Sequence, residues 1–202
     1  MAEKKIGRCN YCGKEFSKLI LKNHYKKCKE KPIRSGDVEE FFLISVEDYY
    51  NKAYWLHISV STKANLKNID TFLRDIWLEC CGHLSEFEID GKNYEKMNVK
   101  VDKVISEGVV FTHDYDFGST TRLKLKVLSR DIAVKRKEKV ELIARNMEPI
   151  VKCSECGEKS TNICTDCGDW ICDKCSEEHD CGEDMLLPVV NSPRTGVCGY
   201  EG

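Results

Sequence analysis

Residues 55–82 decide the fold, and they read WLHISVSTKANLKNIDTFLRDIWLECCG. In the first part, Leu56, Ile58 and Val60 alternate with polar residues, which is the period of a strand. In the second part, apolar side chains recur three or four positions apart along one face of a helix: Leu66, Ile69, Leu73, Ile76 and Cys80. A strand followed by an amphipathic helix predicts a domain that contains both sheet and helix.

The surrounding sequence adds helix ends, turns and further strands. Asn65 or Asn68 can cap the helix, and Gly82 can end it. Downstream, strands are expected on both sides of an Asp90-Gly91 turn and over three further stretches: residues 109–117, 123–127 and 140–144. Residues 133–139 are too charged to assign. We therefore predict an α+β fold with a central antiparallel sheet and one main helix, flanked by two small cysteine-rich modules at residues 1–31 and 150–184.

Composition limits the class of protein. The chain has 202 residues, of which 41% are hydrophobic, enough for one domain of ordinary size with small satellites. It contains no apolar run of about eighteen or more residues, and MAEKKIGRC at its start is charged throughout, so we expect no membrane span and no secretory signal. Its thirteen cysteines lie mostly in C-x-x-C pairs, which in a reducing compartment bind metal. We expect a cytoplasmic, metal-binding protein.

The first candidate metal site lies in residues 1–31. Cys9 and Cys12 form a knuckle, and His24 and Cys28 lie one helical turn apart, so four ligands can converge on zinc. A segment this short cannot bury enough apolar surface to fold alone. Metal binding would therefore supply its stability.

This segment resembles the C2H2/C2HC zinc-finger family, with one residue fewer between the ligand pairs and a final Cys28. The resemblance places the base-reading positions near Ser17, Ile20 and Asn23, and an isoleucine offers no hydrogen bond to a base edge. Seven lysines could instead neutralise phosphates: Lys14, Lys18, Lys22, Lys26, Lys27, Lys29 and Lys31. DNA or RNA is thus one candidate partner of residues 1–35, and a protein partner or a solvated basic surface is the alternative.

A second metal-binding region covers residues 150–184. Its eight candidate ligands are three C-x-x-C pairs, a histidine and a last cysteine: Cys153, Cys156, Cys164, Cys167, Cys172, Cys175, His179 and Cys181. Eight ligands make two tetrahedral sites, so three zinc ions (Zn2+) are expected in the whole chain. The gap between Cys167 and Cys172 is short for closing one site from adjacent pairs. We therefore favour an interleaved arrangement: Cys153, Cys156, Cys172 and Cys175 on one zinc, and Cys164, Cys167, His179 and Cys181 on the other.

The ligand pattern resembles the cross-brace modules of the B-box, HIT and AN1 types, and this resemblance implies a protein-interaction module. The one-residue gap between His179 and Cys181 is tighter than in most B-boxes, and Cys198 is available in place of Cys181. A protein partner at residues 150–184 is one hypothesis. A structural clamp on the middle domain is the other.

Charge changes sign along the chain. Residues 1–35 carry eleven basic against three acidic side chains, residues 36–150 seventeen against twenty, and residues 151–202 four against eleven. Bound zinc sharpens this polarity, because three thiolates outweigh one dication. The basic charge of residues 1–35 and the acidic charge of residues 151–202 indicate different partners.

We divide the chain into a finger (1–31), an α+β domain (38–148), a two-zinc module (150–184) and a docked tail (185–202), with a linker at 32–37.

Two motifs of the middle region carry a second resemblance. The stretch from Gly82 to Phe87 contains an H-L-x-x-F turn, and the stretch from His113 to Ser119 ends a strand with Y-D-F-G. Together with Trp55 and the main helix, they resemble the plasmid ORF-three-like family, whose members are labelled TnpR-like transposon passengers. The resemblance implies an α+β fold and no particular activity. The scattered arginines of this region do not supply the chemistry of a serine recombinase.

Our preferred function is that of a zinc-binding, non-enzymatic interaction protein, and the competing hypothesis is an enzyme with a Cys/His/Asp site in the middle domain. The helix end carries Cys80, Cys81 and His83, and a strand end carries His113, Asp114 and Asp116. If these ends meet, a thiol and an imidazole could form a nucleophile or a metal site. The structural alternative is that Cys80 completes the apolar helix face, His83 caps the helix and the aspartates end the strand. We assign no catalytic residue. Cys198 could be a metal ligand, a reactive thiol or a residue without a chemical role, and we favour the last.

Overall fold

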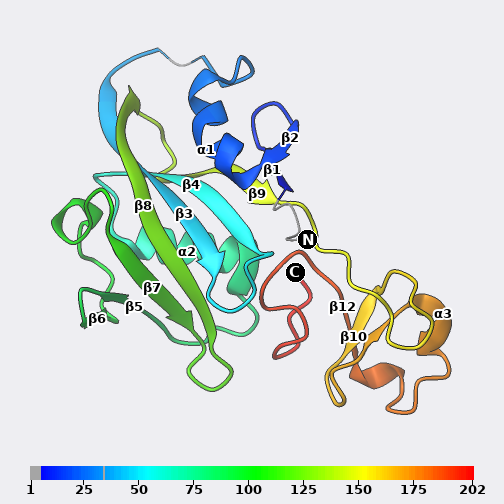
Figure 1. The fold of residues 1–202 in the computed structure, drawn as a ribbon. Coiled ribbons are helices and arrows are strands. Elements are labelled where there is room, and N and C mark those ends of the chain that lie inside the picture. The colour runs from blue at the N-terminus through cyan, green and yellow to red at the C-terminus, as the bar shows by residue number, and fades with distance from the viewer. Residues whose placement is uncertain (1–5, 34) are drawn as a thin grey trace.

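The central domain is built on one large sheet. The computed structural model describes residues 6–33 and 35–202, so residues 1–5 of the finger and Arg34 of the linker lie outside the description. Nine strands pair antiparallel in the order β2-β1-β9-β4-β3-β8-β7-β5-β6 (Figure 1). In chain order they are β1 Ile6–Cys9, β2 Glu15–Ser17, β3 Val38–Asp48, β4 Trp55–Ser61, β5 Ser85–Ile89, β6 Lys92–Tyr94, β7 Val110–Tyr115, β8 Thr121–Val134 and β9 Val140–Asn146. The predicted α+β fold is confirmed.

The main helix begins at a reciprocal cap. Helix α2 covers Leu66–Leu73 and continues as a wider π-helical turn, η1, over Arg74–Leu78. Asn65 is the N-cap, and its side chain and that of Asn68 each accept a hydrogen bond from the other residue's backbone amide. The helix ends at Leu78, before the predicted Gly82, which has a φ of +76° in the following turn. No helix in the described residues is both long enough and apolar enough to cross a membrane.

The core fills the space between α2 and the sheet. It contains alternate side chains of the central strands (Phe42, Ile44, Val46, Leu56, Ile58, Val60, Leu123, Leu125 and Val127) and the apolar face of the helix (Leu66, Ile69, Leu73 and Trp77). Burial of apolar area, at roughly 25 cal/mol per Å², is the main stabilising contribution. The intervening side chains of β3, β4 and β8 point to the opposite face of the sheet.

The finger covers this opposite face. Strand β1 pairs with β9 and β2 pairs with β1, so the finger strands extend the central sheet. Helix α1, Lys18–Lys27, lies on the side of the sheet opposite α2 (Figure 1). Strand β4 is therefore buried on both faces, and Trp55 and His57 are only 0% and 2% exposed.

A smaller three-stranded sheet stands beside the central domain, in the order β11-β10-β12 (Figure 1). Its elements are β10 Asn162–Cys164, β11 Trp170–Ile171, α3 Asp173–Ser176, η3 Glu183–Met185 and β12 Leu186–Pro188, whereas the 3-10 turn η2, Val101–Lys103, belongs to the central domain. Within the predicted docked tail (185–202), the first residues form β12, which completes this small sheet. The chain meets the central domain at Asn191, whose carbonyl oxygen accepts hydrogen bonds from Trp77 Nε1 (3.0 Å) and Arg145 (2.9 Å).

Candidate metal centres and a basic cleft

The four candidate ligands of the finger converge where β1 meets α1. Cys9 ends β1, Cys12 lies in the turn after it, His24 lies in α1 and Cys28 directly follows that helix. Their donor atoms lie within 4.8 Å of one another, and Cys12 Sγ is 3.4 Å from His24 Nε2. Zinc bonds of about 2.3 Å to sulfur and 2.0 Å to nitrogen give sulfur–nitrogen edges of roughly 3.5 Å in a tetrahedron. This cluster has the dimensions and donor set of a zinc site.

Contacts with the central domain fix the finger in place. Leu21 of α1 is fully buried and packs in one cluster with Trp55. The Tyr25 hydroxyl donates a 2.7 Å hydrogen bond to Asp131 of β8, and Lys26 pairs with the same carboxylate at 2.6 Å. The inner side of α1 therefore faces the sheet.

The eight candidate ligands of the C-terminal module form two interleaved clusters. One contains Cys153, Cys156, Cys172 and Cys175, and the other contains Cys164, Cys167, His179 and Cys181. The distance from Cys156 Sγ to Cys172 Sγ and the distance from Cys167 Sγ to His179 Nε2 are both 3.6 Å. The last position of the second cluster is held by Cys181, and Cys198 lies elsewhere.

Backbone amides in this module stabilise thiolates. The amide of Cys156 has the largest effect on Cys153 and helps to lower the pKa of that thiol to about 6. Burial would raise the pKa of Cys164, but the Cys167 amide and the His179 side chain outweigh it, and this pKa also falls to about 6. These interactions favour the thiolate form of both sulfurs, which is the form that binds zinc.

A fourth cluster joins the end of the main helix to the tail. Cys80, Cys81 and His83 lie just beyond η1, and Cys198 reaches them from the tail. All thirteen cysteines of the chain belong to one of the four clusters. The described residues thus offer four candidate metal sites, where the sequence led us to expect three. In the sequence, the signal for the fourth site was the group Cys80, Cys81 and His83 at the helix end, together with the leftover Cys198.

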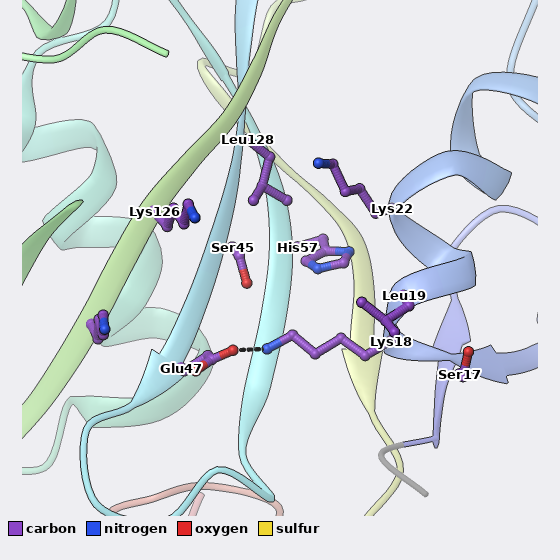
Figure 2. A pocket seen from close by; sticks show the side chains of 10 residues that line it. Ser17, Lys18, Leu19, Lys22, Ser45, Glu47, His57, Lys126 and Leu128 are labelled. Atoms are coloured by element: carbon purple, nitrogen blue, oxygen red, sulfur yellow. Dashed lines mark hydrogen bonds and ion pairs between the residues drawn. The ribbon is translucent and has the colours of Figure 1, made fainter. Parts of the chain in front are cut away.

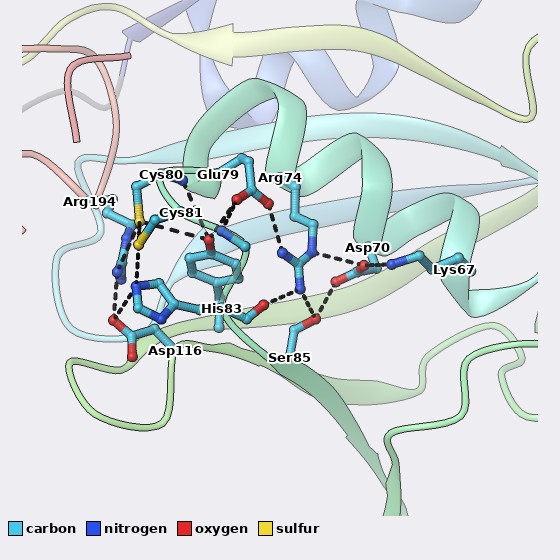
Figure 3. Close-up of polar contacts among 12 residues, drawn as sticks. Lys67, Asp70, Arg74, Glu79, Cys80, Cys81, His83, Ser85, Asp116 and Arg194 are labelled. Carbon is cyan, nitrogen blue, oxygen red and sulfur yellow. Dashed lines mark hydrogen bonds and ion pairs between the residues drawn. The ribbon is translucent and has the colours of Figure 1, made fainter. Parts of the chain in front are cut away.

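The other polar residues expected near this cluster have partners of their own. His113 is fully buried, and its Nε2 lies 2.9 Å from the Asp70 carboxylate. This carboxylate also accepts hydrogen bonds from the side chains of Lys67, Arg74 and Ser85 (Figure 3). Arg122 donates two hydrogen bonds to Asp114. Of the three residues predicted at the strand end, only Asp116 lies close to the cysteine cluster, 3.5 Å from His83 Nε2.

A cleft of about 600 Å³ separates α1 from the sheet face beneath it. Lys126 of β8, Ser45 of β3 and His57 of β4 lie opposite one another across three neighbouring strands and form its floor (Figure 2). The finger supplies the facing wall through Ser17, Lys18, Leu19 and Lys22, and the sheet adds Glu47, Lys124 and Leu128. The cleft therefore exists only because the finger is docked on the sheet.

The charge of this cleft is strongly positive. It has four lysines and one carboxylate, Glu47, which pairs with Lys18. Within the described chain, no ion pair joins Lys22, Lys124 or Lys126 to an acidic group. Burial, followed by the charge of Lys18, lowers the pKa of His57 to about 3, so this ring is neutral at pH 7. Its Nδ1 is buried and has no hydrogen-bond partner among the described residues.

Comparison with known proteins adds little to this geometry. No family model and no curated protein matches the chain. A crystal structure of a protein of unknown function, MM3350 from Methanosarcina mazei Go1, aligns over 59% of this chain and 75% of its own, with a TM-score of 0.45 and 16% identity. The two structures are too dissimilar for the alignment to indicate a function. The resemblance to the plasmid ORF-three-like family stays a prediction.

Proposed function

We propose that the chain is a zinc-binding protein that holds the phosphate backbone of a nucleic acid in the cleft between its finger and its central sheet. The observation that carries this proposal is the convergence of Lys22 of the finger with Lys124 and Lys126 of β8 around one cavity. Glu47 does not cancel their charge, because it pairs with Lys18. A cleft that gathers like charges from two parts of a fold attracts polyanions.

The residues of the cleft suit phosphate contact better than base reading. Lysine binds phosphate as a point charge and carries no sequence information. Among the positions at which the finger family reads bases, Ile20 is 54% exposed but has no polar group, and Asn23 is the one exposed amide. A single amide cannot specify a site. Binding should therefore depend strongly on salt and weakly on sequence.

Zinc supports this function as a structural element. The finger cluster joins His24 and Cys28, at the end of α1, to Cys9 at the end of β1. Strand β1 in turn pairs with β9 of the central sheet. Loss of the metal would release α1 and open the cleft, so zinc removal should also release the nucleic acid.

The test is fluorescence anisotropy with labelled single-stranded DNA, single-stranded RNA and duplex DNA, from about 50 to about 200 mM salt. For the double variant Lys22→Gln/Lys126→Gln, the slope of log K against log[salt] should become shallower by roughly 1.4 to 1.8, the loss of two phosphate contacts. The control is Lys96→Gln/Lys103→Gln, which removes two exposed lysines between β6 and β7. Absence of binding at low salt, or equal slopes for both double variants, would contradict the proposal.

A second candidate function is protein binding by the C-terminal module. A cavity of about 470 Å³ borders both of its clusters and is lined by four carboxylates and one lysine: Glu155, Asp169, Glu178, Asp180 and Lys174. This charge suits a basic segment of a partner protein. Glu178→Gln/Asp180→Asn should weaken binding of an oligolysine peptide at unchanged zinc content. Equal peptide binding by the variant and the parent chain would exclude this surface.

A further inference from the structure

The cluster at the end of the main helix has the dimensions of a tetrahedral metal site. Cys81 Sγ lies 3.7 Å from both Cys80 Sγ and Cys198 Sγ. His83 Nε2 lies 3.0 Å from Cys81 Sγ and 3.2 Å from Cys198 Sγ. Two sulfurs bound to one zinc at about 2.3 Å are separated by roughly 3.8 Å. The donor set, three thiols and one imidazole, is also that of the finger cluster.

The same distances argue against two other chemistries. A disulfide requires sulfurs about 2.05 Å apart, far less than the separation of Cys81 and Cys198. A catalytic Cys-His-Asp group requires the two nitrogens of the imidazole to face different partners. Here His83 Nε2 is the atom nearest both Cys81 and Asp116. Asp116 is instead held by Arg194, at 2.6 Å.

The tail is anchored in a way that presents Cys198 to the other three ligands. Arg194 is fully buried and donates hydrogen bonds to Asp116, to Thr121 Oγ1 and to the carbonyl oxygen of Ser119. Its guanidinium also lies 3.5 Å from Cys80 Sγ (Figure 3). Four residues later, Cys198 has a φ of +52°, a conformation uncommon for any residue but glycine. The backbone turns there and directs the thiol toward the helix end.

We propose that Cys80, Cys81, His83 and Cys198 bind a fourth zinc ion, which fastens the tail to the end of the main helix. Three thiolates and an imidazole select zinc over magnesium or calcium. Four protein ligands leave no open position for a substrate, so the role of this ion is structural. It connects residues 117 positions apart, Cys81 and Cys198, and so closes the chain around the C-terminal module. The module is then tethered to the central domain at both of its ends.

Zinc content of the full-length chain, purified under reducing conditions, tests this site. We expect four equivalents in the parent chain and three in Cys81→Ser and in Cys198→Ser. The double variant should also hold three, because both cysteines serve one ion. Ser192→Ala is the control, since it removes the hydrogen bond from the tail to the Trp77 carbonyl but no ligand, and it should hold four. Three equivalents in the parent chain, or a further loss in the double variant, would overturn the proposal.

A second measurement needs no variant. Cys81 and Cys198 are exposed thiols, so iodoacetamide should reach them quickly unless a metal holds them. In the zinc-loaded chain, peptide mass spectrometry should find both thiols protected, and brief chelation should make both reactive together. Rapid alkylation of either thiol in the zinc-loaded chain would contradict a fourth zinc site.

Discussion

The backbone of Gly7 passes so close to the ring of Trp55 that a Cβ on residue 7 would overlap this ring and the carbonyl oxygen of Arg145. Gly7 lies in β1, Trp55 in β4 and Arg145 in β9, so the contact joins the finger to the central sheet. Glycine is needed here for space. The docking of the finger, and with it the basic cleft, depends on this close approach.

The variant Gly7→Ala should therefore lower the free energy of unfolding by about 1 to 3 kcal/mol, the usual cost of overpacking. Urea denaturation of the zinc-loaded chain measures it. Gly118→Ala is the matched control, because the nearest heavy atom to its Cβ would lie 3.4 Å away. Equal stability of the two variants would show that β1 is not held against Trp55.

Stability between pH 7 and pH 5 should depend on His57. The folded-state pKa of about 3 lies below the ordinary value of 6.5, so between these values the unfolded chain binds a proton that the folded chain does not. The stabilising effect is complete above pH 6.5 and is lost as the pH falls toward 3. At pH 5 the loss is at most about 2 kcal/mol. In His57→Gln, the difference in unfolding free energy between pH 7 and pH 5 should shrink by up to this amount. An unchanged difference would contradict a neutral, buried His57.

The buried carboxylate of Asp70 should be among the most sensitive positions of the central domain. It accepts hydrogen bonds from Arg74 and Ser85 and lies 2.9 Å from His113 Nε2. Asp70→Ala would leave these buried groups without their partner, at a cost of about 3 kcal/mol or more. Asp75→Ala, an exposed carboxylate in the following turn, should cost less than about 0.5 kcal/mol. Urea midpoints for the two variants that agree within error would refute the network's role.

Nucleic-acid binding should depend on the finger metal more than on the C-terminal metals. Cys12→Ser removes a ligand of the finger cluster and should release α1, whereas Cys164→Ser affects only the C-terminal module. We expect affinity for single-stranded DNA at low salt to fall about tenfold or more in Cys12→Ser, the effect of losing the lysines of one wall. Cys164→Ser should bind like the parent chain. A larger loss of affinity in Cys164→Ser than in Cys12→Ser would indicate that the C-terminal module binds the nucleic acid.

Periodicity in the sequence predicted the elements whose apolar side chains alternate or form one stripe, including β4, although this strand is buried on both faces. Strands β7 and β8 alternate, and α2 shows a continuous apolar stripe. Strand β3 was missed, because residues 41–46 read FFLISV without alternation. Such a run is typical of a strand covered on both faces, here by α2 and by the finger. The burial of His57 has the same cause, since the docked finger covers that face of the sheet.

Ligand spacing predicted the clusters whose members lie near one another in sequence. The C-x-x-C knuckles place two sulfurs in one turn, and their pairing follows from the gaps between them. The fourth cluster has no such pattern, because Cys198 is 115 positions from His83 and lies in a stretch without other ligands. The basic cleft was also only half predictable. Its finger lysines stand out in the sequence. Lys124 and Lys126 are placed in the cleft by the register of β8 with β3, which the sequence alone does not show.

The central claim is that zinc binding employs every cysteine of this chain, and native mass spectrometry of the full-length protein tests it most directly. Intact mass reports bound metal and disulfides together, because each disulfide removes two hydrogens. The chain should carry four zinc ions, with all thirteen cysteines reduced after the metal is stripped under acid. A chain that carries three zinc ions or fewer, or whose cysteines are joined in disulfides, would contradict the claim.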